Sequence, residues 1–168
     1  MLIYHPAFDI YNCIFRVLQL LSYTNDAEIE VDKLRIWDFY LTFPREVRKI
    51  KFPMELSALK KVFKEKEQNL YEDLIDPRRI MDRMKPYQLA ALKALASYGF
   101  IDKDSLSKNV VKKTNKEIPL ELKQQLSELS VEKLNILKLI TGFKDLPLYG
   151  DFGLKARTGL IDFKYDAK

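Results

Sequence analysis

The sequence predicts a mainly α-helical protein with a winged helix-turn-helix-like core, additional helices and a small β-hairpin. Apolar residues recur at intervals of three and four along most of the chain, which is the period of amphipathic helices. A helical stretch ending at Gly99 is followed by a short apolar run, a polar turn and a second apolar pair, Val110-Val111. We expect a single domain over residues 1–168, made of a helical part at 1–84, a winged-helix-like segment at 86–116, and a helical pair with a C-terminal tail at 119–168.

The first two predicted helices lie before Pro44. His5-Pro6 opens the first, because a proline in the first turn loses no helical hydrogen bond, and Asn25-Asp26 ends it. Asp32 can cap the second, which ends at Phe43, since a residue before proline avoids helical backbone. Its aromatic residues are expected in the core rather than as exposed anchors: Trp37, Phe39, Tyr40 and Phe43.

The middle of the chain predicts one basic connection and further helices. The segment from Arg45 to Pro53 is basic and is expected to be a loop or a short strand. The spacing of apolar residues predicts a third helix over 56–70. Asp76-Pro77 and Lys85-Pro86 each predict a separate helix start, and Gly99 suits the end of the second of these helices. Two more helices are expected over 120–129 and 131–141.

Bulk properties limit the class of protein. Hydrophobic residues make up 47% of the chain, which is enough for an ordinary globular core. Cys13 is the only cysteine, so an internal disulfide is excluded and a reducing compartment is expected. The N-terminus lacks the pattern of a signal peptide, and no apolar run approaches the roughly 20 residues of a membrane span. These features predict a cytoplasmic protein.

The net charge of +5 is distributed unevenly. Residues 1–44 carry three basic and six acidic groups, whereas residues 106–168 carry twelve basic and eight acidic groups. Such an asymmetry can indicate an anionic partner such as nucleic acid. The alternative is that the basic groups form ordinary solvated helix faces.

The sequence offers little catalytic chemistry. His5 is the only histidine, and no metal-ligand spacing joins it to Cys13. Cys13 lies in an apolar helical run, where an inert buried thiol is expected. The glycines match no phosphate-binding loop, and the letters Gly150-Asp151-Phe152-Gly153 stand without the other motifs of a kinase. We therefore expect no enzyme activity, no cofactor and no metal.

A winged helix would bind DNA through its third helix and its wing. The third helix, expected at 87–98, offers Lys93 with Gln88 and Ser97, which is a poor set for reading base edges. The wing offers lysines that suit a DNA backbone: Lys108, Lys112, Lys113 and Lys116. Sequence-specific reading is therefore not expected. Non-specific backbone contact, or use of the fold as a protein–protein module, stays open.

The C-terminal tail alternates basic, small and large apolar residues, although chain ends are usually polar. Either the domain's own core or another protein must bury it. The candidate partner-binding residues in the tail are Leu154, Lys155, Arg157, Thr158, Leu160 and Phe163. A second candidate is Arg35 with Asp38, which stand at i, i+3 and can pair. For these two, an ion pair within the fold is the alternative to an interface.

Four segments stand out in order along nearly the whole chain: Tyr4-His5-Pro6-Ala7-Phe8-Asp9, Arg16-Val17-Leu18, Leu34-Arg35-Ile36-Trp37-Asp38-Phe39-Tyr40-Leu41-Thr42-Phe43-Pro44 and Leu154-Lys155-Ala156-Arg157-Thr158-Gly159-Leu160. Together they resemble the middle component of ABC-three-component systems, the bacterial anti-phage systems also called Lamassu. The third and fourth segments are the specific ones. The resemblance implies a small helical subunit without catalysis that joins an SMC-like (Rad50-like) coiled-coil ATPase and a separate effector, often a nuclease.

Besides a nuclease of unfamiliar pattern, which metal-dependent DNA cleavage by the purified chain would reveal, two functions stay open at this point. The first, implied by the resemblance, is a non-catalytic accessory subunit that bridges the SMC/Rad50-like ATPase and a nuclease effector, with indirect or non-specific DNA contact and no membrane. The second is a free-standing winged-helix DNA-binding regulator or antitoxin. DNA affinity of the isolated protein with a steep salt dependence would favour the second.

Overall fold

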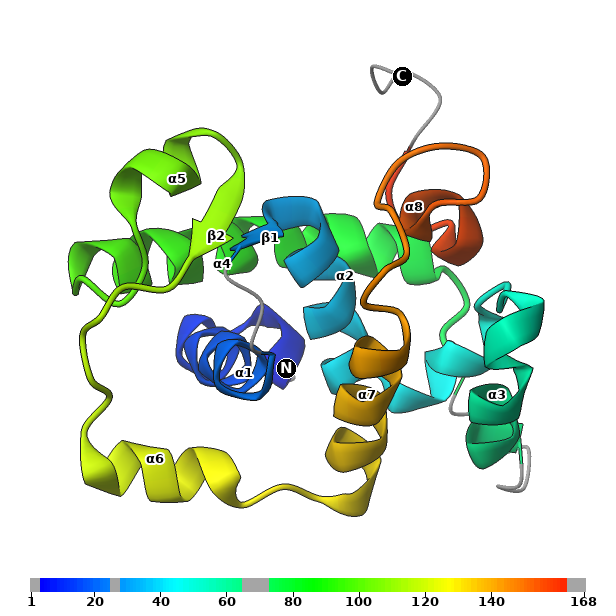
Figure 1. Cartoon of the computed structure of the whole chain (residues 1–168), viewed down its shortest axis with the longest axis horizontal. Helices are drawn as coiled ribbons and strands as arrows, with labels where there is room; N and C mark the ends of the chain where they lie inside the picture. Colours follow the sequence, from blue (N-terminus) through cyan, green and yellow to red (C-terminus); the bar gives the residue numbers. More distant parts are fainter. Residues whose placement is uncertain (1–3, 25–27, 65–72, 163–168) are drawn as a thin grey trace.

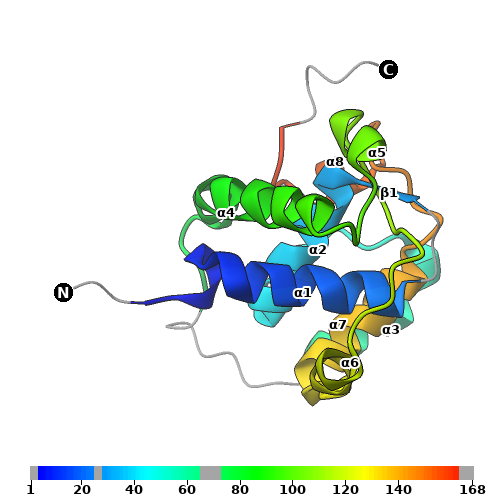
Figure 2. The same cartoon turned by 90° about the vertical axis from the view of Figure 1, so that its left-hand side faces the viewer.

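Helix α1 (Ile10–Tyr23) lies between helices on two opposite sides. The computed structural model describes residues 4–24, 28–64 and 73–162. Figure 1 shows α1 end-on, with α4 (Pro77–Ser97) above it and α6 (Leu120–Ser127) below it. Figure 2 shows the same order, with α4 above α1. Buried apolar side chains from Ala7 to Leu160 form one core cluster.

The start of the chain divides into a short 3-10 turn and a helix. His5-Pro6 opens only η1 (Pro6–Phe8), and α1 begins after Asp9. The Asp9 carboxylate accepts a hydrogen bond from the Asn12 backbone N–H at 2.9 Å, as an N-cap does. The predicted helix start is therefore wrong, because Asp9 has extended backbone and separates the turn from the helix. The predicted end at 25–26 lies outside the described residues.

Helix α2 (Val31–Thr42) is buried from residue 34 to residue 41. The predicted cap is wrong: Asp32 lies in the first turn, and Glu30 holds the N-cap position without a side-chain hydrogen bond. The reason is that a strand runs directly into the helix. Phe43 is half-buried. The other aromatic residues predicted for the core are confirmed there, at 2% exposure or less: Trp37, Phe39 and Tyr40.

The basic segment after α2 is helical rather than extended. It forms η2 (Pro44–Lys49), which buries the Val47 side chain completely. The prediction of a loop or short strand is wrong for 45–49, where the 3-10 turn carries Val47 into the core, and the loop is confirmed for 50–53, which form neither helix nor strand. Helix η3 (Met54–Leu56) then leads into α3 (Ser57–Lys64). The predicted third helix is thus present, and its expected last turns at 65–70 lie outside the described residues.

Helix α4 continues through Pro86, whereas the sequence predicted two helices. A proline inside a helix removes one backbone hydrogen bond and costs about 3 kcal/mol. Packing outweighs this cost, since α4 buries side chains on both sides of the proline: Met81, Met84, Gln88, Leu92 and Leu95. The predicted start is confirmed, because the Asp76 carboxylate accepts the Arg79 N–H at 3.1 Å.

Gly99 ends α4, as predicted, with a φ of +82°. The Gly99 N–H donates to the Ala96 carbonyl at 3.1 Å, and the Phe100 N–H donates to the Leu95 carbonyl at 2.9 Å. These two bonds form a Schellman motif, in which the residue with positive φ reverses the chain.

The sheet joins two segments that lie far apart in the sequence. Strand β1 (Glu28–Glu30) precedes α2, and β2 (Val110–Lys112) follows α4. They pair antiparallel, with Ile29 opposite Val111. The mainly helical fold with a small antiparallel sheet is therefore confirmed, although the partner of β2 was not foreseen. A strand of three residues is too short to leave an alternating pattern.

The segment between α4 and β2 differs from the predicted strand and turn. Ile101 makes a single antiparallel bridge with Lys113, so the expected strand is reduced to one position. The expected polar turn contains α5 (Lys103–Ser107), because the Asp102 carboxylate caps it, accepting a backbone N–H of its first turn at 2.9 Å. The winged-helix interpretation of 86–116 stays a prediction.

Three helices complete the chain. Helices α6 and α7 (Val131–Gly142) confirm the predicted helical pair. Helix α7 packs against α2, and the chain then passes upward in Figure 1 to α8 (Leu154–Thr158), which the sequence did not predict as a helix. Within the described ranges, every helix is too short or too polar to cross a bilayer.

The Gly99→Ala substitution should lower the free energy of unfolding by about 1–2 kcal/mol, because an L-residue is strained at positive φ. Added volume is not the cause, since a Cβ would meet its nearest neighbour, Lys116 Cδ, at 3.7 Å. Urea denaturation checks this. The exposed Ser97→Ala variant is the control and should unfold like the parent; equal stability of Gly99→Ala would contradict the explanation.

Candidate partner interface at helix α8

A buried ion pair joins α1 to α2. Arg16 Nε lies 2.6 Å from Asp38 Oδ1, and Arg16 Nη2 donates to Asp38 Oδ2 at 3.3 Å. Both side chains are at most 5% exposed. From α4, the Gln88 amide donates to the same Oδ2 at 2.9 Å. Each of these three polar side chains has a hydrogen-bond partner in this network, and burying any of them without one would be costly.

Arg35 belongs to the same network, but it does not pair with Asp38. Its guanidinium donates to Gln88 Oε1 and to Asp32 Oδ1, each at 2.9 Å. Asp32 and Asp38 both stand three residues from Arg35, so spacing alone allowed either pair. The predicted Arg35–Asp38 pair is wrong because the Asp38 carboxylate turns toward Arg16 on α1. Arg35 and Asp38 are both buried, as the fold-internal alternative requires.

Asp32 connects this network to α8. Lys155 Nζ lies 3.1 Å from Asp32 Oδ2, and the Lys155 side chain is 4% exposed. The ammonium also lies 4.8 Å from the centre of the Tyr149 ring. Burial by itself would raise the pKa of Asp32, but hydrogen bonds from Lys155 and Arg35 and their charges outweigh it and lower that pKa. Asp32 is therefore ionised at neutral pH and holds both cations.

The apolar residues of the tail pack on the chain's own core. Leu154 is fully buried, and Leu160 is 3% exposed. Gly153 allows this approach, because a Cβ there would lie 2.8 Å from the Leu148 carbonyl oxygen. The sequence left open whether the chain's own core or another protein buries the tail. For Leu154 and Leu160, it is the chain's own core. Phe163 lies outside the described residues.

The polar residues of α8 also have partners within the chain. Arg157 Nε donates to the Phe152 carbonyl at 2.7 Å, and Arg157 Nη1 donates to the Lys51 carbonyl at 2.9 Å. The Thr158 hydroxyl donates to the Leu154 carbonyl at 2.9 Å. Arg157 therefore fixes two loops through their backbones rather than through a carboxylate. It remains partly exposed.

Aromatic side chains are exposed around α8. Phe152 is 76% exposed and Tyr149 is 46% exposed. The Arg157 guanidinium lies 6.0 Å from the centre of the Phe152 ring. Exposed Lys51 lies beside Arg157, since the Lys51 backbone N–H donates to the Arg157 carbonyl at 3.0 Å. We name these four residues, Lys51, Tyr149, Phe152 and Arg157, the α8 surface. Aromatic residues and arginine are enriched in protein–protein interfaces.

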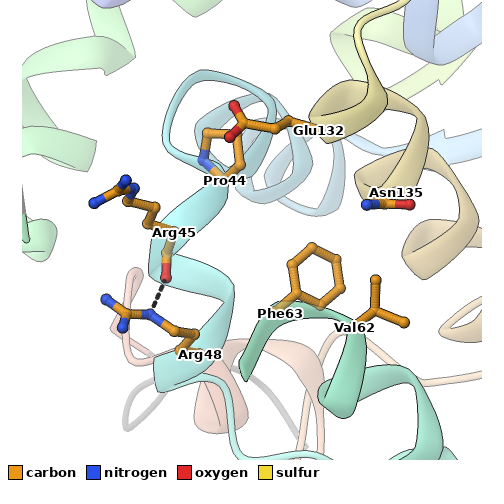
Figure 3. Close-up of a pocket in the computed structure, with 7 residues that line it drawn as sticks. All are labelled: Pro44, Arg45, Arg48, Val62, Phe63, Glu132 and Asn135. Atoms are coloured by element: carbon orange, nitrogen blue, oxygen red, sulfur yellow. Dashed lines mark hydrogen bonds between the residues drawn. The ribbon is translucent and has the colours of Figure 1, made fainter. Parts of the chain in front are cut away.

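Two hollows among the described residues differ in size and lining. A notch of about 40 Å³ lies between η2, α3 and α7 (Figure 3). At its edge, Arg48 Nε donates to the Arg45 carbonyl at 3.1 Å. Its lining offers no thiol, hydroxyl or imidazole: Pro44, Arg45, Arg48, Val62, Phe63, Glu132 and Asn135. A wider groove of about 470 Å³ between α1, α6 and α7 is lined largely by apolar residues, among them Ile118, Leu126, Leu129 and Leu137.

Cys13 and His5 do not form a reactive pair. Cys13 is fully buried, and burial followed by the charge of Asp38 raises the pKa of its thiol far above the usual range. His5 instead caps η1, accepting the Ala7 N–H at Nδ1, and stacks on Phe43 with ring centres 5.3 Å apart. Within residues 4–24, 28–64 and 73–162, no three His, Cys, Asp or Glu side chains gather as metal ligands do.

The four wing lysines differ in their surroundings. Lys113 Nζ donates to the Leu21 carbonyl at 2.7 Å, and Lys116 Nζ donates to the Tyr98 carbonyl. Lys112 Nζ lies 3.8 Å from Glu28 Oε1 across the sheet. Lys108 is exposed beside α5. Three of the four ammonium groups therefore have partners within the chain, which weakens this set as a surface for phosphates.

Fold and surface together define a small helical protein whose described residues gather no metal-ligand cluster and expose aromatic side chains around α8. Comparison with known families adds a direct assignment: residues 2–166 match the family described as ABC-three component (ABC-3C) system Middle Component 5. The chain belongs to this family and is thus one component of a multi-component anti-phage system. No curated protein and no solved structure matches the chain.

The structure divides the residues in and around α8 into buried and exposed ones, a division that the sequence does not show. Leu154, Lys155 and Leu160 were candidates for partner contact, and they are buried within the chain. In the sequence, Phe152 stands out only as part of a kinase-like string of letters, yet its side chain is 76% exposed beside α8. The signal that could have revealed it is a phenylalanine directly before Gly153, in a four-residue segment that contains two glycines.

Asp32→Asn should lower the free energy of unfolding at pH 7 by about 1–3 kcal/mol, because it removes the carboxylate charge that pairs with buried Arg35 and Lys155. The folded-state pKa of Asp32 is lowered. Its contribution is therefore complete above the unfolded-state pKa of about 3.9 and is lost as pH falls through the folded-state pKa. Urea denaturation from neutral to acidic pH should show the difference from the parent narrowing.

The control for this experiment is Asp145→Asn, which removes an exposed carboxylate from the turn after α7. It should leave the pH profile of stability unchanged. A stability difference for Asp32→Asn that is constant over the whole pH range would contradict the role given to the ionised carboxylate.

Proposed function

We propose that this chain is a non-catalytic accessory subunit of a Lamassu-type anti-phage complex, in which it bridges an SMC/Rad50-like coiled-coil ATPase and a nuclease effector. The observation that carries the proposal is the family match over residues 2–166. A middle component acts beside other subunits, so its surface must bind them. We place the complex in the cytoplasm, in keeping with the free thiol of Cys13.

The α8 surface is the proposed contact with a partner subunit. Phe152 provides a large apolar side chain, and Arg157 is held in place by two backbone carbonyls. Interface hot spots combine such aromatic residues with arginine, and a preordered side chain loses less entropy on binding. Leu154, Lys155 and Leu160 serve the same interface indirectly, since they fix α8 to the core.

A lack of catalysis is supported by the chemistry of the described residues. The Cys13 thiol is buried and stays protonated, and the His5 ring caps a 3-10 turn. The Cys13 thiol and the His5 imidazole are therefore not placed to act together on a substrate. Metal-dependent cleavage of DNA by the purified chain would contradict this part of the proposal.

The assembly can be tested by co-expressing the chain with the other components of its own system and purifying it through an affinity tag. A coiled-coil ATPase and a nuclease should co-purify. Recovery of the chain alone, at the mass of a monomer or dimer, would contradict the proposal. A deletion of 154–168 is a poor test, because it would remove buried Leu154 and Leu160 and damage the fold.

Phe152→Ala should weaken the partner contact by about 2 kcal/mol, equivalent to about 30-fold in Kd, as truncation of a hot-spot aromatic does. Its thermal midpoint should match that of the parent, because the side chain is 76% exposed. Leu120→Ala on α6 is the matched control, with a side chain 71% exposed. The α8 surface is ruled out as the interface if Phe152→Ala co-purifies normally.

A further inference from the structure

Helix α4 turns a basic face away from the core. It contains five basic residues and one acidic residue, Asp82. Because α4 is one helix through Pro86, basic residues on both sides of that proline share a single axis. Arg79, Arg83 and Lys93 are exposed. At 100° per residue they fall on the side of α4 opposite to its buried residues, which include Met84 and Leu92.

An aromatic cluster supports the middle of this face. The Arg83 guanidinium lies 4.5 Å from the centre of the Phe8 ring, and the Phe8 ring lies 6.1 Å from the ring of Tyr87. Stacking on an aromatic face orients the guanidinium before any ligand arrives. Burial, followed by the charge of Arg16, lowers the pKa of neighbouring His5, so the charge at neutral pH comes from Arg83 rather than from the imidazole.

We propose that the exposed side of α4 contacts the phosphate backbone of duplex DNA, and we name this set, Arg79, Arg83, Tyr87 and Lys93, the α4 face. From Arg79 to Lys93 the helix rises about 21 Å, at about 1.5 Å per residue. Three cations, Arg79, Arg83 and Lys93, share this side of α4 with the exposed carboxylate of Asp82, so the side carries a net positive charge. A duplex, with one negative charge per roughly 1.7 Å of its axis, is complementary to that charge. The complementary charge favours DNA as the occupant.

The contact is with backbone rather than with base edges. Arginine and lysine bind phosphates without reading sequence, whereas the amide side chain that could read adenine in this helix is Gln88. Gln88 is buried, and its amide is held by Asp38 and Arg35. The α4 face therefore binds duplexes of different sequence alike.

The α4 face suits contact with DNA better than the wing does. The expected third helix began after Pro86 and so contained Lys93 alone among basic residues. The actual helix adds a basic half that precedes the proline: Arg78, Arg79, Arg83 and Lys85. In the wing, by contrast, Lys113 and Lys116 donate to carbonyls of the chain itself.

Fluorescence anisotropy of the purified full chain with a labelled duplex of about 20 base pairs, about two helical turns, tests the proposal between about 50 and about 200 mM salt. The parent should bind, with affinity falling as salt rises. The double substitution Arg79→Gln and Arg83→Gln should reduce the slope of log K against log salt by about 1.8, or about 0.9 for each lost phosphate contact. A duplex of scrambled sequence should bind equally.

Two variants keep the test specific. The double substitution Arg79→Lys and Arg83→Lys keeps both charges and should keep the slope. The double substitution Lys108→Gln and Lys112→Gln removes two cations from the wing and should leave the slope unchanged. Circular dichroism should show the same thermal midpoint for all variants, since the substituted side chains are exposed.

The proposal is overturned if the parent does not bind the duplex at about 50 mM salt, or if the wing variant lowers the slope as much as the α4 variant does. It is also overturned if the α4 variant keeps its DNA affinity but no longer co-purifies with a subunit, because the face would then bind an acidic protein. Phe152→Ala should leave DNA affinity unchanged, so failure here and failure of the assembly proposal are distinguishable.

Discussion

The carboxylate of Asp38 is the point on which the helical core depends. It lies on α2 with no exposed surface and accepts bonds from Arg16 of α1 and Gln88 of α4. A buried carboxylate without these partners would be strongly destabilising, so three helices must meet in one arrangement. Apolar packing would tolerate small rotations of each helix, whereas hydrogen bonds of 2.6–2.9 Å allow very little.

The same network reaches the C-terminal part of the chain. Gln88 contacts Arg35, Arg35 contacts Asp32, and Asp32 holds Lys155 of α8. A helix of five residues could not hold its position by its own hydrogen bonds. Its place depends on one buried lysine, on apolar burial of Leu154, and on glycines that allow the tight turn before it. The exposed Phe152 is thereby presented from a rigid support, which is what a binding residue needs.

The segment that follows α8 lies beside the start of α4. Arg78, at the start of α4, lies 3.4 Å from Asp162, which follows α8. In the proposed complex, the accessory subunit contacts a protein partner through the α8 surface and DNA through the α4 face.

The sequence by itself determined the helical class, most helix positions and the apolar core. Periodic apolar residues, Asp76 as a cap and Gly99 as a helix end are local signals, and local geometry enforces them. The family resemblance also rested on short segments that a sequence displays directly. The local rule that a proline marks the start of a new helix failed at Pro86, because burial along both halves of α4 outweighs one lost hydrogen bond.

Only the tertiary structure decided which partners the polar residues take. Arg35 had two carboxylates at equal spacing, and the approach of α1 decided between them. Leu154 and Leu160 of the tail could have been buried by the chain's own core or by another protein, and the fold buries both in its own core, beside the Lys155–Asp32 pair. Likewise the pairing of β1 with β2 joins segments about eighty residues apart. Such long-range contacts leave no periodic trace, because they depend on how whole helices pack.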